Sequence, residues 1–275
     1  MTPSGPKWVG VGSVRVRYYD EGQGETVLLL HGLGGFAEHW WKNIDPLSRR
    51  FRVIAPDIVG FGLTDKPKAD YTLGYFVEFV SAFVNALGIA RTAIIGTSLG
   101  GAVAMQRALS DPGSVRKLVL VASVGLAERA GGFIRSLLLP IAESLSIRPS
   151  RWMLKFGYRH VVHRYRPDYG VLIERQYNVM RSADAQRVFY EVSRRLIDAD
   201  AYRHGYLLLG RLCEIRIPVL LIAGREDRVI PLTHSVRARK YFPEASLVEL
   251  EDCGHMPYLE KPGEFNSLVI NFLEN

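Results

Sequence analysis

Short apolar runs recur along the chain and alternate with stretches of helical spacing. The first stretch, residues 14–19, alternates apolar and polar side chains as a strand does. Later runs suit strands that are buried on both faces of a parallel sheet, and they lie at residues 26–30, 52–55, 93–96, 118–122 and 219–223. Helical patterns follow at residues 75–87, with a stop at Gly88, at 99–109 and at 232–241. The alternation predicts an open α/β sheet with right-handed crossovers.

This alternation stops after residue 122. Between residues 126 and 211 no convincing strand pair is visible, and four stretches have helical patterns instead: 133–145, 169–181, 185–196 and 201–212. Strand character returns at residue 217. The simplest organisation is one α/β core, formed by residues 1–124 and 212–275, that is interrupted by a helical cap at residues 125–211.

The positive charge of the chain is concentrated in this cap. The whole sequence has 35 Lys and Arg against 28 Asp and Glu, a net charge of +7. Residues 126–211 hold 15 cations against 8 anions, which leaves 20 of each elsewhere. The simplest interpretation of this excess of positive charge is a solvated helical surface. The functional alternative is an electric field that attracts anionic substrates or an anionic surface. No motif of a nucleic-acid reader accompanies it, and the aromatic residues there are expected to line a pocket or pack the cap: Trp152, Phe156, Tyr158 and Tyr165.

Composition excludes several classes of protein. An apolar share of 48% and a charged share of 23% over 275 residues describe a globular protein rather than a disordered, collagenous or coiled-coil chain. Two cysteines provide neither a disulfide framework nor a zinc cluster, so no metal is expected. The N-terminus lacks the apolar core of a signal peptide, and no apolar run is long enough to span a membrane. A cytoplasmic protein without stable membrane insertion is expected.

The strongest chemical signal is GTSLG at residues 96–100. Ser98 of this motif lies directly after an apolar strand and directly before a helix. A serine on such a sharp turn is presented outward, and only small residues two positions away allow the tight backbone. We therefore predict that Ser98 is a nucleophile.

A nucleophilic serine needs a base, and the base needs an orienting acid. His255 and Asp227 both follow predicted strands, in the chain order of serine, acid and histidine. Both fall at the edge of the sheet where Ser98 falls, which is where open α/β sheets place their sites. Glu226 and Asp252 are rival acids. Glu226 is expected to be solvated or to cap a helix, and Asp252 is expected to shape a turn. The remaining histidines are expected to be surface or partner-bound: His39, His160, His163, His204 and His234.

A glycine-rich loop follows the apolar strand at residues 26–30 and reads HGLGG. Acyl transfer needs two N–H donors for the developing oxyanion. We expect the backbone of Leu99, directly after the nucleophile, to supply one donor and that of Leu33 to supply the other. His31 is expected to tie the loop down.

Together these motifs resemble the α/β-hydrolase superfamily. The resemblance covers about residues 12–122 and 213–275 and rests on HGLGG (31–35), DIVGFGLTD (57–65), GTSLGG (96–101), GREDRVIP (224–231) and DCGHMPYLEKP (252–262). It implies a mostly parallel eight-stranded core, a triad of Ser98, His255 and Asp227, and a pocket between core and cap. It implies no cofactor.

The residue at the nucleophile position separates branches of this superfamily. Epoxide hydrolases and haloalkane dehalogenases use aspartate there, so Ser98 argues against both. Hydrolysis of carboxylic esters with small to medium acyl chains is then the expected function, with a small-molecule ester as the partner.

Two alternatives stay open. Carbon–carbon hydrolases of meta-cleavage-type dienolate acids share the architecture and use a cap arginine, and Arg175 within VLIERQY is similar to that segment. Met256 and Thr97 depart from that family, which usually has tryptophan after its histidine and asparagine before its serine. The second alternative is a non-catalytic binding protein. Candidate substrate-binding residues are Trp41, Phe133, Leu137, Arg175 and Met256. The sequence gives no indication of the oligomeric state.

Overall fold

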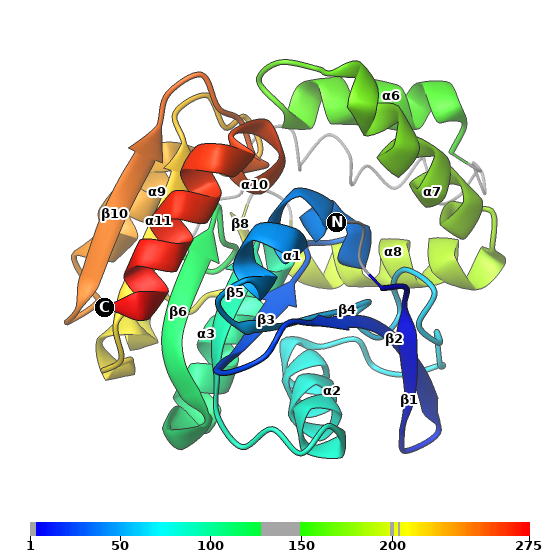
Figure 1. Ribbon diagram of the computed structural model, residues 1–275. Helices are drawn as coiled ribbons and strands as arrows, with labels where there is room; N and C mark the ends of the chain where they lie inside the picture. The colour runs from blue at the N-terminus through cyan, green and yellow to red at the C-terminus, as the bar shows by residue number, and fades with distance from the viewer. Residues whose placement is uncertain (1–3, 128–148, 199–200, 203) are drawn as a thin grey trace.

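A single large sheet organises the structure, a computed structural model that describes residues 4–127, 149–198, 201–202 and 204–275. Its strand order is β1-β2-β4-β3-β5-β6-β9-β10. Only the β1–β2 and β2–β4 pairs are antiparallel in this sheet. The strands are β1 (Lys7–Val11), β2 (Val14–Glu21), β3 (Thr26–Leu30), β4 (Arg52–Pro56), β5 (Thr92–Thr97), β6 (Val115–Val121), β9 (Val219–Gly224) and β10 (Ala245–Leu250). The prediction of a mostly parallel eight-stranded α/β sheet is confirmed (Figure 1).

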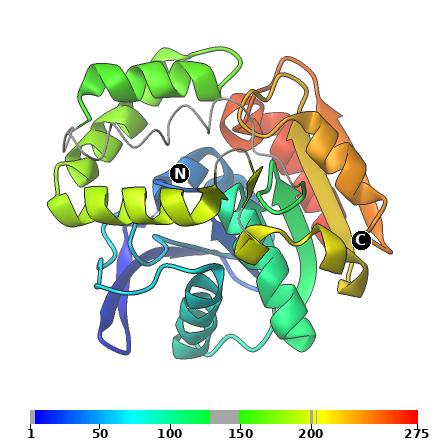
Figure 2. The ribbon, with the colours of Figure 1, turned by 180° about the vertical axis from the view of Figure 1, so that it is seen from behind.

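Helices cover both faces of the sheet (Figures 1 and 2). One face carries α1 (Trp41–Ser48), α10 (Pro257–Glu260) and α11 (Pro262–Glu274), and the other carries α2 (Leu73–Ala86), α3 (Leu99–Ser110) and α9 (Leu232–Arg239). Successive residues of β3 alternate between the layers, because Val27 belongs to the core cluster that includes α1 and α11, whereas Leu28 belongs to the cluster that includes α2 and α3. Burial on both faces explains why these strands are continuous apolar runs.

The end of α2 shows how local sequence sets an element boundary. Gly88 has a φ of +68°, and its N–H donates to the carbonyl of Asn85 at 2.9 Å. The N–H of Ile89 donates to the carbonyl of Val84 at the same distance. These two bonds form a Schellman motif, whose left-handed residue favours glycine. The helix stop predicted at Gly88 is therefore confirmed.

A second group of helices lies over the edge where the parallel strands end. This group contains α6 (Arg151–Val161), η3 (Pro167–Tyr169), α7 (Gly170–Met180) and α8 (Ala183–Leu196) (Figures 1 and 2). α7 and α8 correspond to two of the predicted helices, whereas α6 was not predicted and the helix expected at 133–145 lies outside the described residues. The division into a core (1–124 and 212–275) and a cap (125–211) stays a prediction.

The helix expected at residues 201–212 is wrong. The structure has a short antiparallel pair, β7 (Ile197–Asp198) with β8 (Ala201–Tyr202), followed by η4 (His204–Tyr206) and η5 (Leu209–Glu214). Gly205 and Gly210 explain the difference, because each glycine inside a helix costs about 1 kcal/mol relative to alanine. Among the helices of the described residues, none has both the length and the apolar character to span a membrane.

Candidate active site

Ser98 occupies a strained turn between β5 and α3. Its backbone has φ +52° and ψ −117°, a conformation that costs a non-glycine residue about 1–3 kcal/mol. The surroundings hold the turn, because the N–H of Ser98 donates to Val121 at 3.0 Å and its carbonyl accepts from Val124 at 3.1 Å. The strand, turn and helix predicted around Ser98 are thus present.

Two glycines bring the loop after β3 against this serine. A Cβ on Gly100 would lie 2.3 Å from the carbonyl oxygen of Leu30, so only glycine lets the first turn of α3 approach the end of β3. A Cβ on Gly32 would lie 3.1 Å from Cβ and 3.6 Å from Oγ of Ser98. The loop predicted to supply an oxyanion donor therefore lies directly beside the nucleophile candidate.

His31 fixes the orientation of that loop. Its Nε2 accepts the N–H of Ile58 at 2.9 Å, so its Nδ1 carries the proton and donates to the carbonyl of Gly32 at 2.8 Å. Complete burial lowers the pKa of His31, and the neutral ring that results suits this pair of bonds. The expected role of His31 in tying the loop down is borne out by these contacts.

The same bonds orient the predicted oxyanion donors. A trans peptide points its N–H away from its C=O, so fixing the Gly32 carbonyl also fixes the N–H of Leu33 on the opposite side. Leu99 is the first residue of α3, where N–H groups have no partner within the helix and the helix dipole is positive. Both groups are therefore held by the backbone, and their oxyanion role stays a prediction.

Asp227 and His255 meet where β9 and β10 end. Oδ2 of Asp227 lies 2.8 Å from Nδ1 of His255, while its Oδ1 accepts the N–H groups of Val229 at 2.7 Å and Ile230 at 2.9 Å. A carboxylate only accepts, so Nδ1 carries the proton and the lone pair of Nε2 is left for a second partner. Both residues are buried, with 7% of each exposed. This arrangement suits a general base and its orienting acid.

The rival acids are engaged elsewhere. Oε2 of Glu226 accepts the N–H of Cys253 at 2.8 Å, which fastens the start of the histidine loop. Asp252 is exposed, has a φ of +49° and pairs with Arg164 at 3.0 Å. Asp252 thus shapes the turn as expected.

A buried carboxylate, not predicted from the sequence, clamps the histidine loop. Oε1 of Glu260 accepts the N–H of Met256 at 3.1 Å, and both of its oxygens accept that of Gly254 at 3.1 Å. Its Oε2 also accepts the N–H of His163, beyond α6, at 2.7 Å. Burial raises the pKa of Glu260, and these amide bonds lower it only in part. Glu260 therefore fixes both neighbours of His255 and ties them to the segment after α6.

Replacing Glu260 by glutamine is expected to lower kcat by about 10- to 100-fold with little change in KM, because small displacements of a catalytic group have effects of that size. All three partners are N–H donors, so the amide NH2 of glutamine would face one of them. The measurement is steady-state kinetics on one substrate. Glu264→Gln, an exposed change in the first turn of α11, is the matched control. An unchanged kcat in Glu260→Gln would contradict this role.

A comparison with protein families adds to this geometry. The model of the alpha/beta hydrolase family matches residues 27–268, which includes every element that carries the candidate triad. The chain belongs to the alpha/beta hydrolase family. The protein is therefore a hydrolase.

Individual relatives of this alpha/beta hydrolase cover almost the whole chain. An uncharacterised protein of Mycobacterium tuberculosis is 31% identical over 92% of this chain and 76% of its own length. The 2-hydroxy-6-oxo-6-phenylhexa-2,4-dienoate hydrolase of Burkholderia cepacia is 30% identical over 97% of this chain and 93% of its own. A meta-cleavage product hydrolase from Pseudomonas fluorescens IP01 superposes with a TM-score of 0.85 at 28% identity, covering 98% of this chain and 97% of that one.

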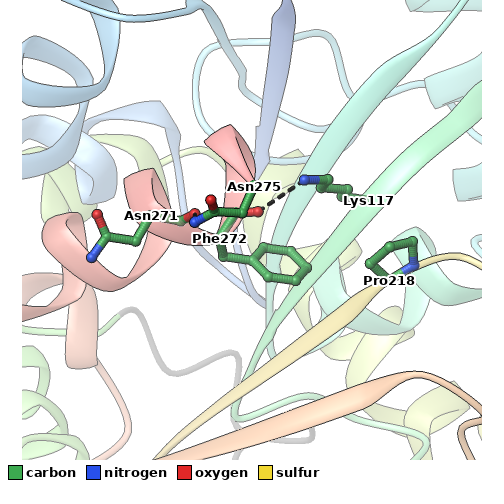
Figure 3. A pocket seen from close by; sticks show the side chains of 5 residues that line it. All are labelled: Lys117, Pro218, Asn271, Phe272 and Asn275. Atoms are coloured by element: carbon green, nitrogen blue, oxygen red, sulfur yellow. Dashed lines mark hydrogen bonds between the residues drawn. The ribbon is translucent and has the colours of Figure 1, made fainter.

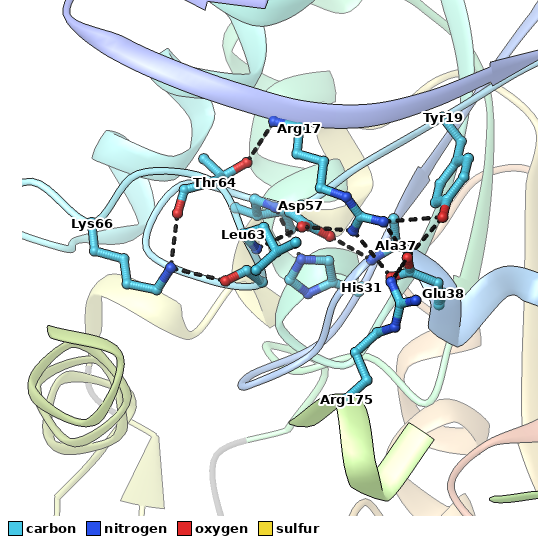
Figure 4. A network of polar contacts seen from close by, with 12 residues as sticks. Arg17, Tyr19, His31, Ala37, Glu38, Asp57, Leu63, Thr64, Lys66 and Arg175 are labelled. Carbon is cyan, nitrogen blue, oxygen red and sulfur yellow. Dashed lines mark hydrogen bonds and ion pairs between the residues drawn. The ribbon is translucent and has the colours of Figure 1, made fainter. Parts of the chain in front are cut away.

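In this alpha/beta hydrolase, a buried polar network joins the core to α7 (Figure 4). Glu38, in η1 (Ala37–Trp40), pairs with Arg17 of β2 and with Arg175 of α7. It also accepts the hydroxyl of Tyr19 at 2.8 Å. Asp57 contacts Arg17 at 3.1 Å and accepts the N–H of Ala37 at 2.7 Å. Arg175 thus reaches η1, which follows the loop beside the site, and its guanidinium is already bound to Glu38.

The charges in this network stabilise one another. Burial opposes the charge of Arg17, but its pairing with Glu38 and Asp57 outweighs burial and raises the pKa of Arg17. Burial alone would raise the pKa of Glu38, but bonds from Arg17, Tyr19 and Arg175 hold it below its usual value. Burial and the bond to Glu38 raise the pKa of Tyr19 to about 12. Glu38 is therefore ionised between two cations.

The remaining predicted pocket residues are only partly brought to the site. Met256 follows His255 directly and is partly buried against the core. Trp41 starts α1 with 42% of its surface exposed, and Phe133 and Leu137 lie outside the described residues. α7 and α8 do contact the loop, since Gln176 donates to the Gly34 carbonyl at 3.3 Å and a Cβ on Gly34 would lie 3.0 Å from the ring of Phe189.

A separate surface depression of about 430 Å³ lies at the other edge of the sheet (Figure 3). It is lined by Lys117 of β6, by Pro218, which precedes β9, and by the last turns of α11. Nζ of Lys117 donates to the carbonyls of Phe272 at 3.0 Å and Leu273 at 3.2 Å. A cation at a helix C-terminus stabilises that end, so these contacts are structural. In the described ranges, no cluster of three His, Cys, Asp or Glu residues could hold a metal.

Proposed function

We propose that this hydrolase cleaves a carbon–carbon bond beside a ketone in dienolate acids of the meta-cleavage type. One observation carries the proposal: the Burkholderia cepacia and Pseudomonas fluorescens hydrolases, which are named for such substrates, match the chain along almost its whole length. The expected preference for carboxylic esters has less support and becomes the second candidate.

The reaction would use the residues of the candidate triad. Oγ of Ser98 attacks the ketone while Nε2 of His255 removes its proton, and Asp227 stabilises the resulting imidazolium. The N–H groups of Leu33 and Leu99 hold the oxyanion. For this reaction the dienol first shifts the proton of its 2-hydroxyl to the carbon beside the ketone, which makes the other end of the chain an unsaturated ketone. Collapse of the serine adduct breaks the carbon–carbon bond, and its electron pair passes through this unsaturated ketone to the oxygen at position 2. That oxygen takes the proton from His255, and water then hydrolyses the acyl-enzyme to release a carboxylic acid.

Ester hydrolysis would share this acyl-enzyme and differ only in the leaving group. One observation favours it, because the ion-paired groups of the network beside the site are balanced in charge. Arg17 and Arg175 supply two cations, and Glu38 and Asp57 supply two anions. A substrate carboxylate would therefore have to compete with Glu38 for Arg175, whereas a neutral ester would not.

Replacing Arg175 by alanine is expected to lower kcat/KM for a dienolate acid by roughly 10- to 100-fold, the range for one lost hydrogen bond to a charged group. A neutral p-nitrophenyl ester should lose much less, because it has no carboxylate to bind. Steady-state kinetics on both substrates tests this difference.

Arg181→Ala is the matched control, since Arg181 is an exposed cation directly after α7. The control should retain wild-type values on both substrates. Equal losses on the two substrates in Arg175→Ala would mean that the arginine acts through its contact with Glu38, as a link between α7 and the core, and not as a carboxylate ligand.

Product analysis tests the proposed bond cleavage. The wild-type protein is incubated with 2-hydroxy-6-oxo-6-phenylhexa-2,4-dienoate, and the products are separated and identified by mass spectrometry. Two acids, one of them benzoic acid, are expected in equal amounts. An unchanged dienolate, in a preparation that hydrolyses p-nitrophenyl esters, would leave esterase activity as the function.

A further inference from the structure

An aromatic ridge lies exposed on α6. It consists of Trp152, Met153 and Phe156, with exposed fractions of 71%, 41% and 50%. The rings of Trp152 and Phe156 stack on each other, with centroids 5.7 Å apart and planes at 18°. Of the aromatic residues expected to line a pocket or pack the cap, Tyr158 is buried on the inner side of α6, where its hydroxyl lies 2.9 Å from Nε2 of His39. For Trp152 and Phe156 that expectation is wrong.

Cations flank the aromatic ridge on the same helix. Lys155 and Arg159 are exposed, and within the described ranges neither forms an ion pair with a carboxylate. Both lie over the ring of Tyr165, at 5.6 and 5.4 Å. α6 contains no acidic residue, so these two like charges, four positions apart, have no carboxylate on their own helix to offset their repulsion. An external anionic surface would remove this repulsion.

We propose that α6 docks the protein on an anionic lipid surface. Stacked aromatic rings and a methionine supply the apolar face that enters the headgroup region, as in helices that lie in the plane of a membrane. Lys155 and Arg159, beside this face, would meet the negative headgroups. The whole positive excess of the chain lies in the segment that contains α6, which reinforces the attraction. Docking of this kind is peripheral and needs no spanning helix.

The shape of the aromatic ridge favours lipid over nucleic acid. Aromatic platforms for single strands take a base on an open ring face and follow the backbone along a groove. Here the two rings already cover each other, and both residues are exposed on α6. The apolar side chain of Met153 can contact acyl chains, but it offers no hydrogen bond or charge to a sugar or a phosphate.

The test is co-sedimentation of the protein with sucrose-loaded vesicles. One set contains phosphatidylcholine alone, and the other contains equal parts of phosphatidylcholine and phosphatidylglycerol. We expect binding to the second set only, weakened by salt. The Lys155→Glu/Arg159→Glu variant should bind at least roughly 30-fold more weakly, the factor expected for two cations near an anionic surface. Trp152→Ala/Phe156→Ala should also bind more weakly.

Matched controls separate docking from general charge and from misfolding. Trp8→Ala removes an aromatic residue that is 40% exposed on β1, and Arg91→Glu reverses an exposed cation directly before β5. Both should bind as the wild type does, and all variants should keep its thermal midpoint. Absence of binding, equal binding to both vesicle types, or binding that the α6 variants leave unchanged would overturn the proposal. So would a dimer in light scattering that Trp152→Ala/Phe156→Ala dissociates, or binding to a single-stranded oligonucleotide but not to vesicles.

Discussion

Replacing Ser98 by alanine is expected to lower kcat by roughly 10⁵- to 10⁶-fold, the size of the effect when the nucleophile of a triad is removed. The fold should persist, because the strained turn is held by backbone bonds to Val121 and Val124 that alanine retains. Turnover of a p-nitrophenyl ester and of the dienolate measures the loss. Intact-mass analysis after treatment with a fluorophosphonate should show one adduct on the wild type and none on the variant.

Ser110→Ala is the control for this substitution. Ser110 lies at the other end of α3 and is exposed, so its loss should affect neither turnover nor labelling. Retained turnover in Ser98→Ala would remove the serine from the mechanism. Labelling of another serine in both variants would relocate the nucleophile.

Replacing Asp227 by asparagine is expected to lower kcat by about 10⁴-fold through the tautomer of the histidine. The N–H groups of Val229 and Ile230 require an acceptor at Oδ1, so the asparagine oxygen would stay there and its NH2 would face His255. Nδ1 must then accept, and the proton moves to Nε2, which can no longer take the proton of Ser98. Steady-state kinetics together with thermal unfolding separates this effect from a loss of stability.

The matched change is Asp252→Asn, three residues before His255. Asp252 is exposed and pairs with Arg164, so its variant should keep kcat within about twofold, as expected for an exposed ion pair. A larger loss in Asp252→Asn than in Asp227→Asn would move the acid of the proposed triad to Asp252.

Much of the fold could be predicted because local signals agree with the global structure. Strands buried on both faces must be apolar throughout, so β3, β5 and β9 stand out as short apolar runs. β1 gave no such signal, since it lies at the edge of the sheet and is largely exposed. α6 was missed for a related reason: its largest apolar residues face outward, so the pattern does not mark a buried face.

The candidate site divides in the same way. Ser98, Asp227 and His255 could be found because each follows a strand in a short motif, and the structure places Asp227 against His255. The role of Glu260 depends on amides from two distant segments, and a carboxylate in the largely apolar stretch 257–260 was the only local sign of it. Glu38 lies 137 residues from Arg175, so nothing local could reveal that this cation is already paired.

The most direct test of the proposed function compares kcat/KM of the wild-type protein for two substrates measured side by side. One is 2-hydroxy-6-oxo-6-phenylhexa-2,4-dienoate, followed by the loss of its visible absorbance, and the other is p-nitrophenyl butyrate. A higher kcat/KM for the dienolate, with both activities lost in Ser98→Ala, is the predicted result. Efficient turnover of the ester with no turnover of the dienolate would contradict carbon–carbon hydrolysis and identify the protein as an esterase.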